Sequence, residues 1–232
     1  MGAQWKHAGR VEAGAQRGAL FTRLSKEIIV AAKSGDPNPE SNNRLRAALE
    51  NARKNSMPRD TIERALKKGR GETDDDIVYH SVSYEGFCPH QVPIIVECLT
   101  ENRNRTATNL RLLFRKGQLG GSGSVQWMFD RRGLVEASHL TGMDPEDAAI
   151  EAGAQEVCPG EDGVEFICDA TDVDAVTRGL QAMGWVISSA ELGWVPKNLV
   201  ELGEEHRKEV GAFVDGFDDN DDVHRIYVAL KS

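Results

Sequence analysis

Residues 92–129 read VPIIVECLTENRNRTATNLRLLFRKGQLGGSGSVQWMF. The apolar run 92–99 is short and rich in β-branched side chains, which favours a strand over a helix. Leucines and a phenylalanine then recur at helical spacing, with cations on the other face up to residue 116. The glycines of 117–123 keep the backbone loose until alternating apolar residues over 125–129 indicate a second strand. The stretch therefore predicts a strand–helix–strand unit whose helix covers one face of a sheet.

Two parts of this unit are not required for core packing. One is the polar corner 101–106, where Thr100 can cap the turn and Asn102 or Asn104 can cap the helix. The other is the glycine-rich segment 117–123. A phosphate-binding loop follows a strand and opens a helix, whereas these glycines follow a helix and precede a strand. We therefore favour a plain flexible connection over a nucleotide-binding loop.

Charge is divided unevenly along the chain, whose net charge is -9. Residues 1–70 contain 15 Lys and Arg against 7 Asp and Glu, a net of +8, and residues 71–232 contain 13 against 30, a net of -17. Such an asymmetry indicates a segment that binds a polyanion. The alternative is a solvated helical surface that happens to be rich in cations.

The remaining composition argues against several classes of function. The four cysteines form no CxxC pair, and neither a signal peptide nor a long apolar run is found, so we expect a cytoplasmic protein with reduced thiols and no membrane partner. No histidine pair lies at ligand spacing near the cysteines, so we expect no metal and no cofactor. The six histidines are scattered, without a nucleophile elbow. We therefore expect no catalytic residues; a pocket whose groups have shifted pKa values would revive the enzyme hypothesis.

Residues 1–75 are expected to form a basic helical domain with a mobile arm. The arm mixes one tryptophan and several cations with glycines, which suits base stacking with phosphate contact or, equally, a floppy terminus. Apolar spacing predicts helices over 18–34 and 41–54, and a third that starts at 56–58 and ends at Gly69. Three helices of these lengths predict a small bundle.

Cations that the core of this bundle leaves outside, with the aromatic and basic residues of the arm, are the candidate nucleic-acid contacts. They are Trp5, Lys6, Arg10, Arg17, Arg23, Lys26, Lys33, Arg44, Arg46, Arg53, Lys54, Arg59, Lys67, Lys68 and Arg70. Arg103 and Arg105 of the polar corner are a second candidate contact. The competing interpretation is that they form local salt bridges to Glu97, to Glu101 or to carboxylates of the tail.

After an acidic linker at 71–76, the pattern changes from helical to alternating. Residues 79–99 predict a hairpin in which Pro93 occupies an edge strand or a strand start. Residues 131–195 follow the order strand, helix, strand, strand, helix, strand, which is typical of a ferredoxin-like module. A tail helix at 202–217 and a strand at 224–230 would complete the middle domain.

The predicted fold is therefore α+β, an amino-terminal three-helix bundle followed by two ferredoxin-like α/β modules, the second inserted into the first. The domains are expected at 1–75, at 76–130 plus 196–232, and, for the acidic inserted module, at 131–195. We further predict that the last strand, around Tyr227, pairs within the sheet that holds 92–99 or 125–129.

Motifs along nearly the whole chain resemble those of the YebC/PmpR family, which includes the mitochondrial translational activator of cytochrome c oxidase. They are Arg17-Gly18, Phe21-Thr22, Lys26-Glu27-Ile28, NRLRAA at 43–48, MPRDTIERA at 57–65, Tyr84-Glu85-Gly86, LTENRNRT at 99–106, Leu119-Gly120, Gly123-Ser124-Val125 and Met128-Phe129. The resemblance implies the three-part fold and a cytoplasmic regulator of gene expression. Such proteins are described as transcriptional regulators that bind DNA and as ribosome-associated factors that help the synthesis of difficult peptides.

We expect a non-enzymatic nucleic-acid-binding regulator whose partner is DNA or, alternatively, ribosomal RNA on the ribosome. Phosphate contacts supply affinity but carry no sequence information. The sequence shows no helix-turn-helix with a recognition face, no RNP motif and no zinc finger, so DNA and RNA both stay open. The acidic module would repel a nucleic acid, which suggests that it faces protein or solvent. The sequence leaves the oligomeric state open.

Overall fold

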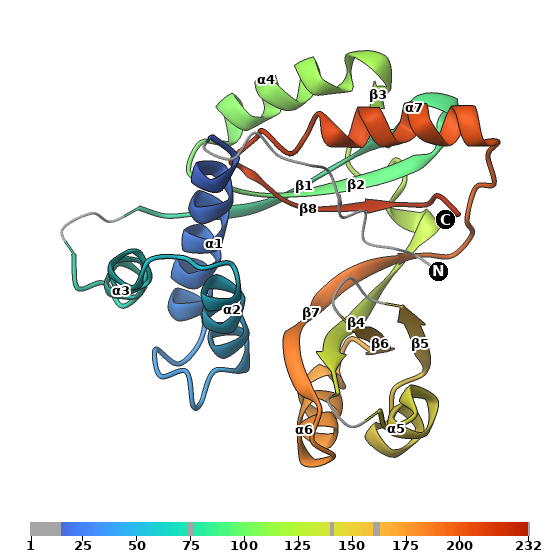
Figure 1. The fold of residues 1–232 in the computed structure, drawn as a ribbon. Coiled ribbons are helices and arrows are strands. Elements are labelled where there is room, and N and C mark those ends of the chain that lie inside the picture. The colour runs from blue at the N-terminus through green and yellow to red at the C-terminus, as the bar shows by residue number, and fades with distance from the viewer. Residues whose placement is uncertain (1–14, 74–76, 140–141, 160–162, 232) are drawn as a thin grey trace. The chain divides into compact units, whose positions relative to one another are not determined.

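The computed structural model describes residues 15–73, 77–139, 142–159 and 163–231 (Figure 1). Within these residues the chain forms seven α-helices and two four-stranded sheets, which confirms an α+β fold. The chain divides into two compact units. Of the described residues, unit 1 comprises 15–26, 77–130 and 194–231, and unit 2 comprises 27–73, 131–139, 142–159 and 163–193.

The amino-terminal helices form close to where the sequence predicts them: α1 (Ala15–Ser34), α2 (Asn43–Lys54) and α3 (Arg59–Gly69). Asn42 caps α2, because its Oδ1 accepts from the amide of Leu45 at 3.0 Å while its Nδ2 donates to the carbonyl of Ala31 at 2.9 Å. Gly69 packs closely on α1, since a Cβ there would lie 2.6 Å from the Cβ of Ala32. The helical segments within unit 2 are thus joined by buried contacts.

Unit 1 is built on the sheet β3-β1-β2-β8, comprising β1 (His80–Phe87), β2 (Pro93–Thr100), β3 (Gln118–Leu119) and β8 (Val223–Val228). β1 and β2 form the predicted hairpin, and Pro93 is the first residue of β2, as its missing amide proton favours. β8 pairs antiparallel with β2, with Ile95 opposite Tyr227. This pairing confirms the prediction for the last strand.

Two helices, α4 (Arg103–Leu113) and α7 (Glu204–Asp215), cover one face of this sheet (Figure 1). Their apolar side chains share one core with the sheet. Its largest members include Ile94, Leu110, Phe114, Phe213 and Phe217, and the rings of the three phenylalanines meet edge to face at 5.3–5.6 Å. The predicted covering of the sheet by the helix after 92–99 is confirmed.

Two local features of unit 1 differ from expectation. Residues 126–128 form a 3₁₀ turn instead of a strand, and the strand that follows α4 is β3. The amides of Gly123, Val125 and Gln126 donate to the carboxylate of Glu85. They are therefore not available for hydrogen bonds to a neighbouring strand. The chain order also departs from a ferredoxin-like module, because β1 and β2 are joined directly before the first helix.

The stretch from 131 onward follows the predicted order of elements. It contains β4 (Phe129–Ser138), α5 (Pro145–Ala152), β5 (Glu156–Pro159), β6 (Val164–Asp169), α6 (Val173–Ala182) and β7 (Val186–Pro196). The sheet order is β5-β6-β4-β7. Its core packs Phe166 against Trp185, with ring centroids 5.0 Å apart. β4 runs without interruption from Phe129 to Ser138.

Candidate nucleic-acid interface

In α2 and α3 the apolar residues of the helical pattern are buried, whereas the cations between them are exposed. In α2 the buried positions include Leu45 and Leu49, and in α3 they include Ile62 and Ala65. Because a helix repeats every 3.6 residues, side chains between these positions face solvent. The exposed cations of the two helices and their ends are Arg44, Arg53, Lys54, Arg59, Arg64, Lys67 and Arg70; Lys33 is exposed on α1.

Some of these cations already have weak partners on the protein. Arg59 contacts Glu63 at 2.8 Å on the surface, and Arg70 donates to the carbonyl of Pro37 at 3.4 Å. Arg46 is half-buried and donates to the carbonyls of Pro39 and Glu40. Exposed ion pairs contribute about 0–1 kcal/mol, so phosphates can replace such partners at low cost. Cations in the last turns of α2 and α3 also favour the helices themselves through the helix dipole.

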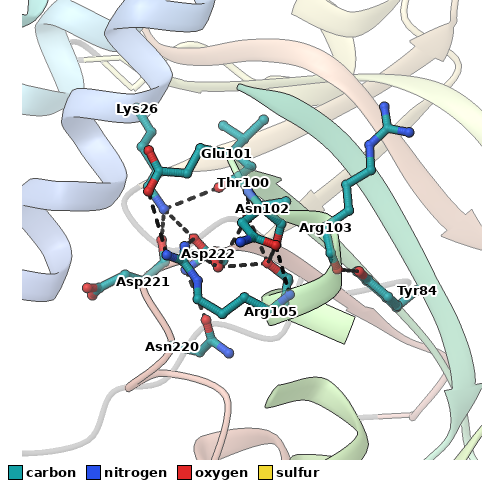
Figure 2. A network of polar contacts seen from close by, with 12 residues as sticks. Lys26, Tyr84, Thr100, Glu101, Asn102, Arg103, Arg105, Asn220, Asp221 and Asp222 are labelled. Carbon is teal, nitrogen blue, oxygen red and sulfur yellow. Dashed lines mark hydrogen bonds and ion pairs between the residues drawn. The ribbon is translucent and has the colours of Figure 1, made fainter. Parts of the chain in front are cut away.

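Lys26 differs from the rest of the candidates because its side chain is turned inward. Its ammonium lies 2.6 Å from Oδ1 of Asp222 and donates to the carbonyls of Leu99, at 3.2 Å, and Asp221, at 2.8 Å (Figure 2). The residue is only 7% exposed. The amphipathic pattern of α1 placed Lys26 off the apolar stripe, but tertiary contacts bury it. We therefore remove Lys26 from the candidate nucleic-acid contacts.

The polar corner is ordered by its own caps. Asn102 is the N-cap of α4, accepting from the amide of Arg105 at 3.1 Å, and the hydroxyl of Thr100 accepts from the amide of Asn102 at 2.9 Å. Both capping roles were predicted from the sequence, with Asn104 as the alternative to Asn102. The hydroxyls of Thr100 and Thr106 lie 2.8 Å apart and are fully buried. These contacts fix the start of α4 beneath Asp222.

The two arginines of the corner have different environments. Arg105 forms a salt bridge with Asp222 at 3.1 Å and a longer one with Glu101 at 3.6 Å. Arg103 points away from Asp222 in Figure 2, and its guanidinium lies 3.2 Å from Nδ1 of His80 on the surface. The geometry thus matches the local salt-bridge interpretation for Arg105, whereas the guanidinium of Arg103 is exposed.

Asp222 is the centre of this cluster, and the sequence offered it only as one of the carboxylates of the tail. Burial by itself would raise its pKa, but hydrogen bonds from Lys26, Thr106 and Arg105 outweigh burial and lower the pKa. The same contact raises the pKa of Arg105. The partners lie 117 and 196 residues away along the chain, so no local pattern could have revealed them.

A cavity of about 640 Å³ opens beside this cluster, lined by Lys26, Arg105 and Asp222 together with Tyr79 and Leu112. A general acid or base needs a pKa near the working pH. Here the pKa of Asp222 is lowered and that of Arg105 is raised, so both groups are held in their charged forms. The cluster has the properties of a structural ion network more than those of a proton-transfer site.

The other candidates from the sequence fall into two groups. Arg23 is half-buried and Lys68 is partly covered. Trp5, Lys6 and Arg10 lie outside the described residues, as does the side chain of Arg17. Within the described ranges, no group of three or more His, Cys, Asp or Glu side chains has metal-binding geometry. In the same ranges, no helix combines the length and apolarity needed to cross a membrane.

The fold and charge arrangement define an α+β protein with basic helices at its amino-terminal end and acidic α/β parts after them. A family model described as "TACO1/YebC protein N-terminal domain" matches residues 3–72, and one described as "TACO1/YebC second and third domain" matches 79–230. The chain therefore belongs to the TACO1/YebC family, which confirms the resemblance seen in its motifs.

Relatives and a solved structure agree over nearly the full length. A Polaromonas protein named "Probable transcriptional regulatory protein" is 52% identical and aligns over 99% of both chains. A Bdellovibrio bacteriovorus protein, "Probable transcriptional regulatory protein Bd1964", is 48% identical over 99% of this chain and 100% of its own. The crystal structure of a conserved hypothetical protein, Aq1575 from Aquifex aeolicus, superposes with a TM-score of 0.84 at 36% identity, covering 98% of this chain and 96% of that one.

Proposed function

We propose that this protein is a non-enzymatic, cytoplasmic regulator of gene expression that binds nucleic acid, with DNA as the partner, through the cations of its amino-terminal helices. The names of its relatives support a regulatory role. The surface that we assign to this role, the basic surface, comprises the exposed cations Lys33, Arg44, Arg53, Lys54, Arg59, Arg64, Lys67 and Arg70, with Arg46 and Lys68 at its margin.

The observation that carries this proposal is that the apolar side of α2 and α3 is used in packing while their cations face solvent. Residues 1–70 have a net charge of +8 in a chain that is acidic elsewhere. Charge effects at physiological salt are limited to about 8 Å, so the -17 of residues 71–232 does not cancel this charge at a distance. Phosphates that replace counterions on such a surface supply affinity for any sequence.

We further propose a division of labour among three parts of the chain. Residues 1–75 form a three-helix bundle with an arm and contact the nucleic acid. Residues 76–130 and 196–232 form one discontinuous domain, into which the acidic module 131–195 is inserted. The acidic module would repel phosphates, so it is suited to contact protein or solvent. Trp5, Lys6, Arg10 and Arg17 of the arm add to the contact with nucleic acid.

The alternative partner is ribosomal RNA on the ribosome. The cations of the basic surface are suited to phosphate contacts, which position a nucleic acid without reading bases. That property fits structured RNA with protein neighbours as well as it fits duplex DNA. The two partners are distinguished by crosslinking in cells followed by sequencing: promoter DNA supports the first, and ribosomal RNA supports the second.

The basic surface is tested by a salt titration of binding to duplex DNA and to ribosomal RNA fragments with the full-length protein. Replacing Lys67, Lys68 and Arg70 by Gln should weaken binding and flatten the slope of log affinity against log salt, by about 0.9 for each duplex phosphate that the variant no longer neutralises. A matched variant with the same charge change at Arg207, Lys208 and Lys231 should leave the slope unaltered. Equal slopes and affinities for the two variants would show that the basic surface is not the binding surface.

A further inference from the structure

The glycine-rich loop, residues 120–127, is held rigidly by a single residue of β1. The carboxylate of Glu85 accepts from the amides of Gly123 at 2.7 Å, Val125 at 2.9 Å and Gln126 at 2.8 Å, and its carbonyl accepts from the amide of Gly120 at 2.8 Å. Glu85 itself is buried. Hydrogen bonds to a charged acceptor are the strong ones, so the loop has a defined shape despite its glycines. These amides are already occupied by a carboxylate, which leaves them unsuited to cradle a phosphate.

This rigid loop presents an exposed tryptophan. Trp127 is 65% exposed, although Val125 and Phe129 on either side are buried. Its indole Nε1 donates to the carbonyl of Ser124 at 3.2 Å, so the polar atom of the ring is bonded within the loop. Space is open where Gly121 and Gly123 would carry side chains. The ring is thus oriented in advance, and binding to it costs little conformational entropy.

The charged residues that precede Trp127 in the sequence favour a nucleic acid over a protein partner, because the carboxylate bonded to the loop, that of Glu85, is buried. Residues 115–129 contain two cations, Arg115 and Lys116, and no carboxylate. Both cations are exposed, and only Gly117 and the two residues of β3, about 10 Å of extended chain, separate them from the glycine-rich loop. The nearest following carboxylate, Asp130, pairs with Lys197 at 3.4 Å. A protein-binding patch would place further exposed apolar side chains beside the ring, whereas the sequence neighbours at 125 and 129 are buried.

We propose that Trp127 is a stacking platform for an unpaired nucleobase, with Arg115 and Lys116 contacting phosphates of the same strand. An aromatic ring beside cations is the combination by which proteins hold single strands. The proposal goes beyond the phosphate contacts assigned to the basic surface, because Trp127 binds a base and belongs to unit 1. It applies to a single-stranded segment, since a base inside a duplex has no free face for the ring.

The test uses the full-length protein and two labelled 12-nucleotide probes, oligouridylate and the same backbone with abasic ribose at every position. Trp127→Ala should weaken oligouridylate binding about 5- to 150-fold, the range for one base stacked on an aromatic ring. The abasic probe, which keeps every phosphate, should bind the variant and the parent protein within a factor of two. Trp127→Phe should retain most of the affinity, and oligouridylate should quench the indole fluorescence of the parent protein more than that of the Phe variant, which keeps the other three tryptophans.

The results that would refute the stacking platform differ from those that would refute the basic surface. The basic-surface variant at Lys67, Lys68 and Arg70 should weaken both probes alike, whereas Trp127→Ala affects oligouridylate alone. The inference is overturned if Trp127→Ala leaves oligouridylate binding unchanged, if it weakens both probes equally, or if the parent protein binds neither. A selective loss with Trp127→Ala, together with an inert basic-surface variant, supports the stacking platform and refutes the basic surface. The exposed position predicts an unchanged melting temperature for Trp127→Ala.

Discussion

Asp222 illustrates how one buried charge organises its surroundings. Its carboxylate is bonded by Lys26, Arg105 and Thr106, and its side chain is 4% exposed. Moving a charge from water into the protein interior costs free energy. Two cations and a hydroxyl offset this cost for Asp222, because they replace the water molecules that would otherwise solvate its carboxylate. A buried ion network of this kind does not by itself stabilise the fold more than apolar side chains of similar size would. Removing one of its members, however, leaves the remaining buried charges unpaired.

Replacing Asp222 by Asn should therefore lower the free energy of unfolding strongly. The amide keeps the shape but leaves Lys26 without its counter-ion in a buried place, a change that costs about 3–5 kcal/mol. Urea unfolding measures the effect. Asp219→Asn is the matched control: it lies in the same turn and is exposed, so its effect should stay within about 0.5 kcal/mol. A similar stability for the two variants would contradict the central role of Asp222.

The lowered pKa of Asp222 also predicts how its contribution depends on pH. A carboxyl whose pKa is lower in the folded than in the unfolded protein binds fewer protons when folded, so its stabilisation is complete above the unfolded value, about 3.9. It is lost as the pH falls through the lower, folded pKa. The difference in unfolding free energy between the parent protein and Asp222→Asn should thus be constant from pH 7 to 5 and shrink below pH 4. A constant difference down to pH 2 would contradict the lowered pKa.

At the scale of elements, the polar corner joins the end of β2 to the start of α4 and to the turn before β8. Thr100, Asn102 and Thr106 supply the caps and buried hydroxyls, and Arg105 adds a partly exposed bridge to Asp222. The amide of Leu99 also donates to the carbonyl of Asp222 at 2.9 Å, so the turn is tied to β2 by backbone as well. The corner is a structural junction, to which Arg103 alone adds an outward-facing guanidinium.

Separate alanine substitutions of Arg103 and Arg105 should divide these roles. Arg105→Ala should lower the melting temperature, because Asp222 loses one of its donors, while Arg103→Ala should leave it nearly unchanged since its guanidinium is on the surface. The fall for Arg105→Ala should be smaller than for Asp222→Asn, because an exposed bridge is screened by solvent. Differential scanning calorimetry measures both. If Arg103→Ala weakens nucleic-acid binding at constant stability, Arg103 is a contact; equal stability losses would refute the division.

At the scale of the whole molecule, the two units bury cysteines to different degrees. Cys88 and Cys98 are buried in unit 1, and Cys168 is buried in unit 2, whereas Cys158 is half-buried. Burial raises the pKa of Cys88 to about 12 and that of Cys168 to about 11, and it also raises the pKa values of Cys98 and Cys158. Thiolates are the reactive form, so all four thiols should be slow to react in the native protein.

Thiol labelling at pH 8 should therefore report the opening of each unit. We expect slow modification of Cys158 first, and modification of Cys88, Cys98 and Cys168 only as denaturant opens the unit that holds each one. Mass spectrometry of peptides after timed labelling measures the order. The single variant Cys158→Ser provides the control, since it should abolish the native-state signal and leave the labelling that follows unfolding. Rapid native labelling of Cys88 would show that unit 1 is less closed than its burial indicates.

Much of this architecture was accessible from local pattern. The 3.6-residue spacing of apolar residues located α1 to α3, and the start of α4 was narrowed to Asn102 or Asn104, because caps and amphipathic stripes depend on neighbours within a few residues. The strands at 92–99 and near the carboxy-terminus were also predicted from local composition and pattern. The uneven charge of the chain was visible in composition, and with it the candidate basic surface. Its role as an interface stays a prediction.

Tertiary structure alone decided which charges are turned inward. Lys26 matched the other helical cations in pattern, yet it is buried on Asp222, 196 residues away. Glu85 converted a glycine-rich segment that we interpreted as a flexible connection into a rigid loop and prevented the strand predicted at 125–129. The physical reason is that burial and pairing depend on groups brought together by the fold, and the cost of an unpaired buried charge makes those long-range partners decisive. Local periodicity carries no information about such partners.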